Sequence, residues 1–536
     1  MDDMSHEVMN QVPPLSGHDV AADPALAAAL AREGADWAEG ELRQLGTLAG
    51  TAKAQEWGRL ANENEPVLRT HDRYGHRIDE VEFHPAWHEL MTVAVEHGLH
   101  AAPWTQARPG AHVARAAKFY VWSQVEAGHG CPISMTYASV AALRHAPALA
   151  AEWEPALASR TYDPGLRPLA DKRGVLAGMA MTEKQGGSDV RANTTTAEPL
   201  GDGTYALNGH KWFNSAPMCD VFLVLAQAPG GLSCFLLPRV LPDGTRNAVR
   251  LMRLKDKLGN RSNASAEVEY ENAVAWLVGE EGRGVRTIIE MVNMTRLDCV
   301  IGSAAGMRLG LTQAVHHTRH RRAFGELLID QPLMRNVLAD LALESEAATV
   351  LMMRLAGATD RAVTGQAQEG LFRRVALAAG KYWVCKRAAG HAAEALECLG
   401  GNGYVEESGL PRLFRESPLN GIWEGSGNVA ALDLMRALTR EPEAAEAYFT
   451  EVELATDPRI SESVSRVRKT LAHATEADAR RLAEEMALVL QASLLIRFAP
   501  ASVSDAFCAS RLGGGSGRAY GALGPGPDLD GILARI

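Results

Sequence analysis

The sequence predicts a mainly helical α+β protein. A β-domain at residues 174–283 separates helical domains at 1–173 and 284–440, and a fourth, helical domain follows at 441–536. The length of 536 residues exceeds what one hydrophobic core usually organises. The spacing of apolar residues changes from a helical period to short β-like segments and back again. The composition, 46% hydrophobic and 22% charged, is that of an ordinary globular protein with large buried cores.

Alanine-rich segments with apolar residues at helical spacing dominate the first domain from Asp23 to about Leu157. The first residues are acidic where a secretory signal carries Lys or Arg. No apolar run reaches the roughly 20 residues that a membrane helix requires. The seven cysteines include no CxxC pair, which favours a reducing compartment and argues against a metal site. We therefore expect a cytoplasmic protein without metal or membrane association.

In the second domain, the helical spacing of apolar residues gives way to a β-like pattern. Short runs rich in β-branched and aromatic residues are separated by Gly, Asn and Asp: GVLAGMAM, TYALNG, VFLVLAQ, SCFLLPR and AEVEYENAVAWLV. This pattern is typical of an antiparallel barrel or sandwich.

Helical periodicity returns after Gly282 in three long segments, and VAALDLMRALTR supplies a fourth helix. Four such helices predict a bundle. Beyond Arg440, SESVSRVRKTLAHA and ADARRLAEEMALVLQASLLIRFA are again helix-like, and a Gly/Pro-rich tail follows them. We expect an appended helical domain there.

Two motifs in the β-domain contain groups that suit a planar polar ligand. MTEKQGGSDVRANTT, from Met181 to Thr195, ends a β-like run in hydroxyls and a Gly turn. In LNGHKWFNS, Phe213 can stack on a ring while Ser215 hydrogen-bonds its edge. Taken alone, each motif is more typical of an ordinary turn or strand than of a binding site.

Two motifs in the later helical domain also have two interpretations. The basic run RHRRAFG either caps a helix dipole or presents a guanidinium fork to a pyrophosphate. Between Leu399 and Asn428 lie two Gly-rich loops, the second of which places Glu424 beside Trp423. A carboxylate desolvated in this way suits a general base, whereas the simpler alternative is an exposed loop residue.

Together, the motifs resemble the acyl-CoA dehydrogenase superfamily in residue type, order and spacing: AMTEKQGGSDV, NGHKWFNSAP, RRAFG with Gln331, LGGNGY and IWEGSGN. LKDKLGNRSNAS, PRLFRES and the C-terminal extension are similar, more narrowly, to its alkylation-response branch. The resemblance implies the acyl-CoA dehydrogenase fold, with an N-terminal helical domain, a central β-barrel and a C-terminal four-helix bundle. It also implies FAD bound between barrel and bundle, and a homotetramer.

The resemblance implies one catalytic residue and a set of cofactor-binding residues. Glu424 matches the base that removes the α-proton of an acyl-CoA thioester, and Thr295 stands where some relatives place that base instead. Glu397 departs from the family's usual Gln, and an acid there would repel a pyrophosphate. The FAD-binding residues implied are Met181, Thr182, Gly187, Ser188, Phe213, Asn214, Ser215, Trp423, Gly425, Ser426 and Asn428, with Arg321, Phe324, Gly400 and Gly401 reaching the FAD of a neighbouring subunit.

The same resemblance implies that the appended domain binds double-stranded DNA. The chain carries a net charge of -11, and residues 441–536 hold 10 Lys or Arg against 14 Asp or Glu, so only a local basic face can meet phosphates. Helical spacing of basic residues, with His473 among them, predicts one such face from Arg466, Arg468, Lys469, Arg480 and Arg481. A solvated amphipathic helix of mixed charge is the alternative.

Two functions follow. The first is a flavoprotein of the adaptive response to DNA alkylation that binds DNA, protects or repairs it, and has weak dehydrogenase activity on isovaleryl-CoA-like substrates. The second is a metabolic dehydrogenase of short or branched acyl-CoA whose extra domain serves only assembly. In a third interpretation, the flavin is purely structural.

Overall fold

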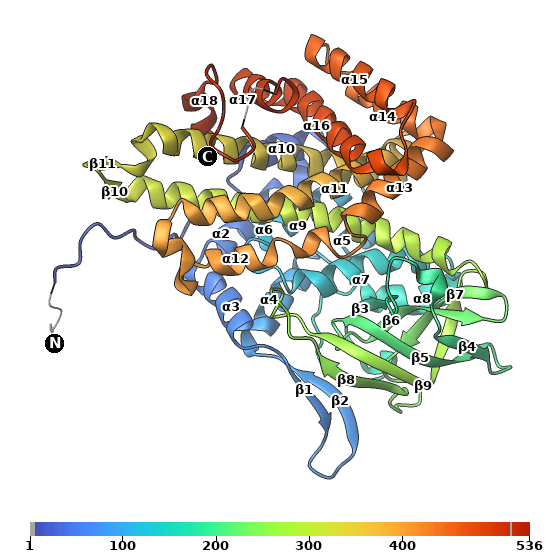
Figure 1. Ribbon diagram of the computed structural model, residues 1–536. Helices are drawn as coiled ribbons and strands as arrows, with labels where there is room; N and C mark the ends of the chain where they lie inside the picture. Colours follow the sequence, from blue (N-terminus) through green and yellow to red (C-terminus); the bar gives the residue numbers. More distant parts are fainter. Residues whose placement is uncertain (1–5, 515–516) are drawn as a thin grey trace. The chain divides into compact units, whose positions relative to one another are not determined.

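The computed structural model describes residues 6–514 and 517–536, which form two compact units (Figure 1). Unit 1 comprises the described parts of Met1–Ala52, His112–Gln124 and Cys299–Ile536. Unit 2 comprises Lys53–Ala111 and Val125–Asp298. The first helical segment of the sequence therefore contributes to both units.

The seven strands of the main sheet in unit 2 lie between Ala177 and Val278 (Figure 1). They are β3 (Ala177–Ala180), β4 (Thr196–Pro199), β5 (Thr204–Ser215), β6 (Val221–Ala228), β7 (Gly231–Pro238), β8 (Val249–Leu254) and β9 (Ser265–Val278). The order is β3-β6-β4-β5-β9-β7, with β8 on β9, and pairing of β6 with β7 closes the sheet. The predicted β-barrel is confirmed. β3 and β4 run parallel to β6, whereas the other pairs are antiparallel.

Unit 2 also contains α3 (Ala52–Glu63), α4 (Pro85–Glu96), α5 (Ala102–Thr105), α7 (Gly130–Leu143) and α8 (Pro147–Leu157). Almost every residue of α7 is buried, because this helix is apolar or small on all sides. A hairpin of β1 (Val67–His71) and β2 (Arg77–Glu82) interrupts the stretch predicted to be entirely helical. The turn between the strands is held by the Asp72 carboxylate, which accepts from the amides of Tyr74 at 2.8 Å and His76 at 2.9 Å.

Unit 1 contains the predicted bundle. Its helices are the later part of α9 (Gly284–His320), α10 (Pro332–Val363), α11 (Ala367–Glu397) and α13 (Gly427–Arg440). α11 packs against α10 and α13, and the Cys385 thiol of α11 donates to the Cys299 carbonyl of α9 at 3.4 Å. Also in unit 1 are α1 (Pro24–Arg32), α2 (Glu39–Ala49), α6 (Ala111–Trp122), α12 (Leu410–Glu416) and the short hairpin of β10 (Arg322–Ala323) and β11 (Glu326–Leu327).

The appended domain is helical, as predicted. It comprises α14 (Pro442–Val452), α15 (Pro458–Leu471), α16 (Ala479–Phe498), α17 (Ala501–Phe507), a π-helical turn (Cys508–Leu512) and α18 (Leu529–Leu533). Buried Arg354 of α10 binds Glu451 of α14 at 2.7 Å and Glu369 of α11 at 2.8 Å. Arg354 therefore joins the bundle to the appended helices. Each buried charge in this contact has a partner of opposite charge, which offsets the cost of removing it from water.

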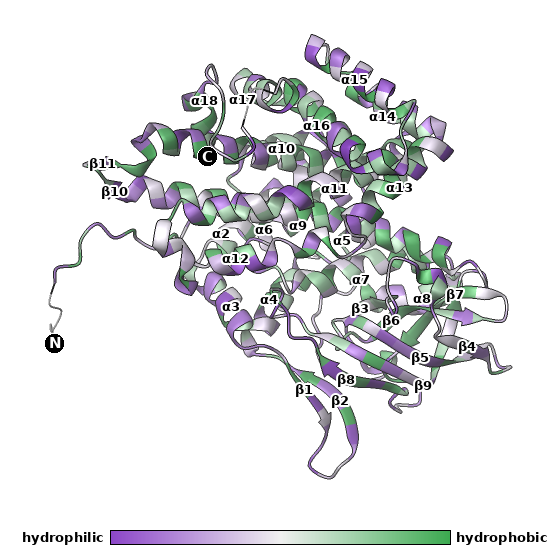
Figure 2. Ribbon diagram, in the orientation of Figure 1, coloured by the Kyte–Doolittle hydropathy of each residue, from purple (hydrophilic) through white to green (hydrophobic). Residues whose placement is uncertain are grey.

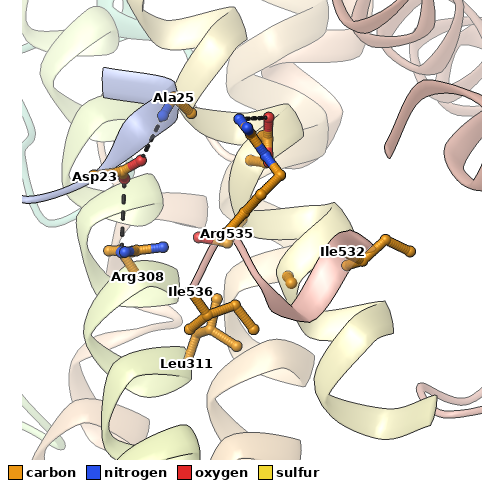
Figure 3. Close-up of a pocket in the computed structure, with 10 residues that line it drawn as sticks. Asp23, Ala25, Arg308, Leu311, Ile532, Arg535 and Ile536 are labelled. Atoms are coloured by element: carbon orange, nitrogen blue, oxygen red, sulfur yellow. Dashed lines mark hydrogen bonds and ion pairs between the residues drawn. The ribbon is translucent and has the colours of Figure 1, made fainter. Parts of the chain in front are cut away.

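A small cavity in unit 1 shows how α18 is attached to α1 and α10 (Figure 3). The guanidinium of Arg535 binds Glu346 at 2.6 Å. Asp23, which also lines the cavity, lies 3.6 Å from Arg308 (Figure 3). Asp23 also accepts a hydrogen bond from Tyr120 at 2.9 Å. Because these charges are paired with one another, the cavity is a structural junction. Among the described residues, no helix is long and apolar enough to cross a membrane.

Candidate active site

A buried ion pair holds the turn that follows β3 in unit 2. Lys211 Nζ lies 2.8 Å from Glu183 Oε1, and both side chains have an exposed fraction of 0%. Lys211 also donates to the Leu225 carbonyl at 2.7 Å, and Glu183 accepts from the Thr194 amide at 2.7 Å. Burial raises the pKa of Glu183, but hydrogen bonds from Gln185, Lys211 and Thr194 outweigh burial and keep that pKa well below its usual range. Glu183 is therefore an ionised anchor of the turn.

The anchored turn folds back over Thr182. A Cβ atom added at Gly187 would lie 2.4 Å from the Thr182 hydroxyl, so only glycine fits there. Met181 and Thr182 are half-buried, while Gly187 and Ser188 are exposed. The Trp212 amide donates to the Thr182 carbonyl at 2.8 Å, which joins the turn to β5. Two motifs that the sequence kept apart thus form one surface.

A bulge in β5 turns Phe213 outward on this surface. The register with β9 shifts between Lys211 and Asn214, so the chain gains one residue on β5. As a result, Phe213 is 50% exposed, whereas Asn214 is 2% exposed. Asn214 Oδ1 is buried and has no hydrogen-bond partner among the described residues. A buried acceptor without a partner beside an exposed aromatic ring is what a bound planar heterocycle would satisfy. Ser215 ends the same strand.

Glu424 lies in a tight loop before α13 in unit 1. Its φ of 58° is left-handed, a conformation that side chains other than Gly, Asn and Asp rarely adopt. Lys381 of α11, which is only 1% exposed, donates to the carbonyl of Trp423 at 2.9 Å and also to that of Gly425. Both peptide neighbours of the candidate base are therefore bound to one buried ammonium. Ser426 occupies the N-cap position of α13 without a capping bond from its side chain, and Asn428 lies in the first turn of the helix.

The predicted arginine lies at the end of α9, where an N-terminal segment binds it. Arg321 donates to the Asn10 carbonyl at 2.5 Å. The Asn10 side chain exchanges two further bonds with the backbone of Arg322, each of 2.9 Å. Phe324 at the tip of the β10–β11 hairpin is 99% exposed with a φ of 53°. Sequence reasoning missed Asn10, because nothing in its surroundings indicates so distant a partner.

The other glycine loop, Gly400–Tyr404, follows α11. Gly400 has a φ of 59°, and both Gly400 and Gly401 are exposed. Lys381 marks the position of the Glu424 loop on α11, and the 16 residues from there to Glu397 span about 24 Å of helix. Within one subunit, the structure therefore does not bring the Gly400 loop and Glu424 together.

The basic residues of the appended domain divide into two groups. Arg466 and Lys469 are exposed and line a shallow groove on α15 with Ser461, Ser465 and Thr470. In the described part of the chain, neither has a carboxylate partner. Glu462 also lines the groove. The apolar residues of α15 are buried on its other side, and Figure 2 shows hydrophilic positions along this helix.

The remaining predicted cations have partners. Arg468 binds Glu446 at 3.0 Å and stacks on Phe449, while Arg481 binds Asp478 at 3.1 Å. Arg480 lies on α16 and donates to the Tyr382 hydroxyl at 3.2 Å. The spacing predicted that these residues share one face of a helix. The structure contradicts this prediction, because α15 ends at Leu471 and a capping box at Thr475 begins the next helical segment.

Comparisons with known proteins agree with this architecture. The family description "Adaptive response protein AidB N-terminal domain" matches residues 10–164. The acyl-CoA dehydrogenase middle domain matches 178–273, and the C-terminal domain matches 282–439. The chain is 48% identical to "Putative acyl-CoA dehydrogenase AidB" of Escherichia coli over 94% of each chain. It is 31% identical to "Acyl-CoA dehydrogenase family member 11" of Caenorhabditis elegans, over 75% of this chain and 67% of the relative.

Solved structures show the same fold. A structure described as "Bd2924 apo-form" has a TM-score of 0.85 at 30% identity, covering 92% of this chain and 100% of the other. ACDH-11 of Caenorhabditis elegans in complex with C11-CoA has a TM-score of 0.84 at 26% identity, covering 99% and 93%. An acyl-CoA dehydrogenase from Bacillus anthracis solved with FAD has a TM-score of 0.65, covering 84% and 82%; at 19% identity it shows the fold alone.

The residues present fit FAD. The buried acceptor of Asn214 lacks a partner among the described residues, and a donor on a bound ligand would satisfy it. On the matching domains and on the identity to the Escherichia coli relative, the chain belongs to the AidB branch of the acyl-CoA dehydrogenase family, a family of FAD-dependent oxidoreductases.

Proposed function

We propose that this flavoprotein dehydrogenates acyl-CoA thioesters weakly, with isovaleryl-CoA-like substrates preferred, and also binds double-stranded DNA during the adaptive response to alkylation. It would protect or repair that DNA in the cytoplasm as a homotetramer. The observation that carries the enzymatic part is the Glu424 loop, where a buried ammonium holds the carbonyls on both sides of a half-buried carboxylate.

In this proposal, Glu424 removes the α-proton of the thioester. When bound, FAD supplies the acceptor for the hydride that leaves the β-carbon. Phe213 and Asn214 would bind the flavin ring, and Ser215 would bind its edge. Thr182 and Ser188 on the anchored turn would supply hydroxyls, and the amide of Gly187 would add a further donor. A fixed carboxylate needs no reorganisation before proton transfer, which is why a rigid loop favours this role.

The separation along α11 supports the expected division of the cofactor site between subunits. Gly400 and Gly401 lie about 24 Å along the helix from the Glu424 loop. At this distance, Gly400 and Gly401 can contact the FAD of a second subunit more readily than the FAD bound beside Glu424 of the same chain. Arg321 and Phe324 on the exposed hairpin would act in the same way, with the guanidinium binding the pyrophosphate. Glu397 is exposed at the end of α11 and remains an unfavourable charge near such a ligand.

The DNA-binding part rests on Arg466 and Lys469. Two exposed cations without carboxylate partners in the described chain, flanked by three hydroxyl side chains, suit the phosphates of a duplex. Arg468 and Arg481 suit them less, because each already binds a carboxylate. DNA binding should therefore be mostly phosphate-driven and only weakly sequence-specific, and its affinity should fall steeply as the salt concentration rises.

The experiment for DNA binding is a gel shift across a salt series. The variant Arg466→Glu/Lys469→Glu should lose binding at every salt concentration. The matched control, Arg468→Glu/Arg481→Glu, reverses the same number of charges on residues that already have partners, and it should retain most binding. Equal losses in both variants would show that only net charge matters, and unchanged binding in the first would refute the assignment.

A metabolic dehydrogenase whose extra domain serves only assembly is the second candidate, and the net acidity of residues 441–536 favours it. Anaerobic titration of the flavin absorbance with isovaleryl-CoA and straight-chain acyl-CoAs separates the two functions. Rapid bleaching without any gel shift would support the metabolic enzyme. Slow bleaching with a salt-sensitive gel shift would support the alkylation-response protein.

A further inference from the structure

Lys381 is a buried charge that none of the sequence motifs includes. It lies in the middle of α11 within the run ALAAGKYWVC, where its neighbours are apolar or small. Its exposed fraction is 1%, and it is among the largest fully buried side chains of the protein. Transferring an ammonium out of water is costly, so the interior must provide compensation.

The compensation comes from two backbone carbonyls. Lys381 Nζ donates to the carbonyl of Trp423 at 2.9 Å and to that of Gly425. In the described part of the chain, no carboxylate forms an ion pair with it. The usual acidic partner of a buried lysine is thus replaced by the peptide groups on either side of Glu424.

The peptide between those carbonyls has an unfavourable conformation. Glu424 has a φ of 58° and Gly425 a φ of 99°. A left-handed glutamate persists only where the surrounding structure fixes it, and such outliers concentrate at functional sites. Trp423 contributes a second restraint, because its indole donates to the Asn420 side chain at 2.9 Å. The loop is therefore held from both ends.

We infer that Lys381 is the positioning residue of the base: by binding the carbonyls of Trp423 and Gly425, its ammonium holds Glu424 left-handed and fixes the direction of the carboxylate. This inference rests on the proposed role of Glu424. Lys381 does not touch substrate in this account. It acts through the backbone of the loop.

The test compares Lys381→Met with Glu424→Gln and with the double variant, all as FAD-loaded protein. The measurements are FAD content, thermal unfolding and the rate of anaerobic flavin reduction by isovaleryl-CoA from pH 6 to 9. We expect Lys381→Met to keep FAD but to reduce it at least tenfold more slowly across this whole pH range. In the Glu424→Gln background, the same change should cause less than a twofold further loss, because its effect passes through Glu424.

A matched control is Lys118→Met. Lys118 is also buried, but it lies on α6 and binds Glu41, away from the loop. This variant can lose thermal stability, yet its rate of flavin reduction should match that of the wild type. If Lys381→Met does not fold, Lys381→Gln, which keeps one donor for the carbonyls, takes its place in the same comparison with Glu424→Gln and the double variant. If both fold, Lys381→Gln should lose less activity than Lys381→Met.

The outcomes separate the two claims. Slow reduction in Glu424→Gln with a normal rate in Lys381→Met would overturn the role of Lys381 alone. Fully multiplicative effects of the two substitutions would do the same, since independent losses indicate a general structural role. A normal rate in Glu424→Gln would refute the proposed base itself.

Discussion

Breaking the Glu183–Lys211 pair tests whether the turn proposed to bind the flavin is held before any cofactor binds. In Glu183→Gln, an amide group replaces one carboxylate oxygen among donors from Lys211, Thr194 and Thr195, so a donor faces donors. Removing one partner of a buried ion pair costs about 3–5 kcal/mol. For a unit of this size, each kcal/mol lowers the melting temperature by roughly 2–4 °C. We therefore expect a loss of roughly 6–20 °C in the melting temperature.

The assay is thermal unfolding of Glu183→Gln, Lys211→Met and the double variant, each with and without added FAD. The double variant should be less destabilised than the sum of the single variants, because no uncompensated charge remains buried. The single variants should also release FAD faster. Losses below 2 °C in both single variants, or strict additivity in the cycle, would refute the view that this pair anchors the turn.

Three further predictions concern separate parts of the protein. Burial raises the pKa of Asp220 to about 6, so folding favours its neutral form; this stabilisation is complete below the unfolded pKa and is lost as pH rises through 6. Asp220→Asn also loses the ion pair with the buried side chain of Lys172, 3.1 Å away. From pH 4 to 7, the difference in unfolding free energy between variant and wild type should nevertheless move by about 3 kcal/mol in favour of the variant, and a pH-independent difference in chemical unfolding would contradict the shift. Asn10→Ala removes both side-chain bonds to Arg322, so FAD should dissociate faster from the variant, whereas equal dissociation rates would show that the hairpin is held by other contacts. Gly187→Ala places a methyl group against Thr182 and should lower FAD content at purification without preventing folding; full occupancy would show that the turn can open.

Most of the architecture could be predicted, because the spacing of apolar residues within each segment indicates whether it forms a helix or a strand. The four bundle helices follow from apolar spacing over long segments, and the barrel follows from short β-rich runs between turn residues. The β1–β2 hairpin could not be predicted in the same way. Its strands are short and partly exposed, so they lack the apolar runs that mark the barrel strands.

Parts of the candidate site depend on contacts that no local pattern encodes. Glu424 could be found from its motif, but Lys381 lies 43 positions earlier and is indicated only by a charge within an apolar helix. Asn10 accepts a hydrogen bond from Arg321 although the two residues lie more than 300 positions apart in the sequence. The basic face was predicted from helical spacing, but a helix end after Leu471 and nearby carboxylates divide it. Pairing in three dimensions decides which charges remain available.

The rate of anaerobic flavin reduction in Glu424→Gln tests the central claim most directly. Amide replaces carboxylate without a change in size, so FAD content and acyl-CoA binding should stay close to those of the wild type. General-base catalysis contributes roughly 10²–10⁴-fold, and the account predicts a loss of that order in the reduction rate with isovaleryl-CoA. Reduction at the wild-type rate, in a variant shown to hold FAD and thioester normally, would contradict it.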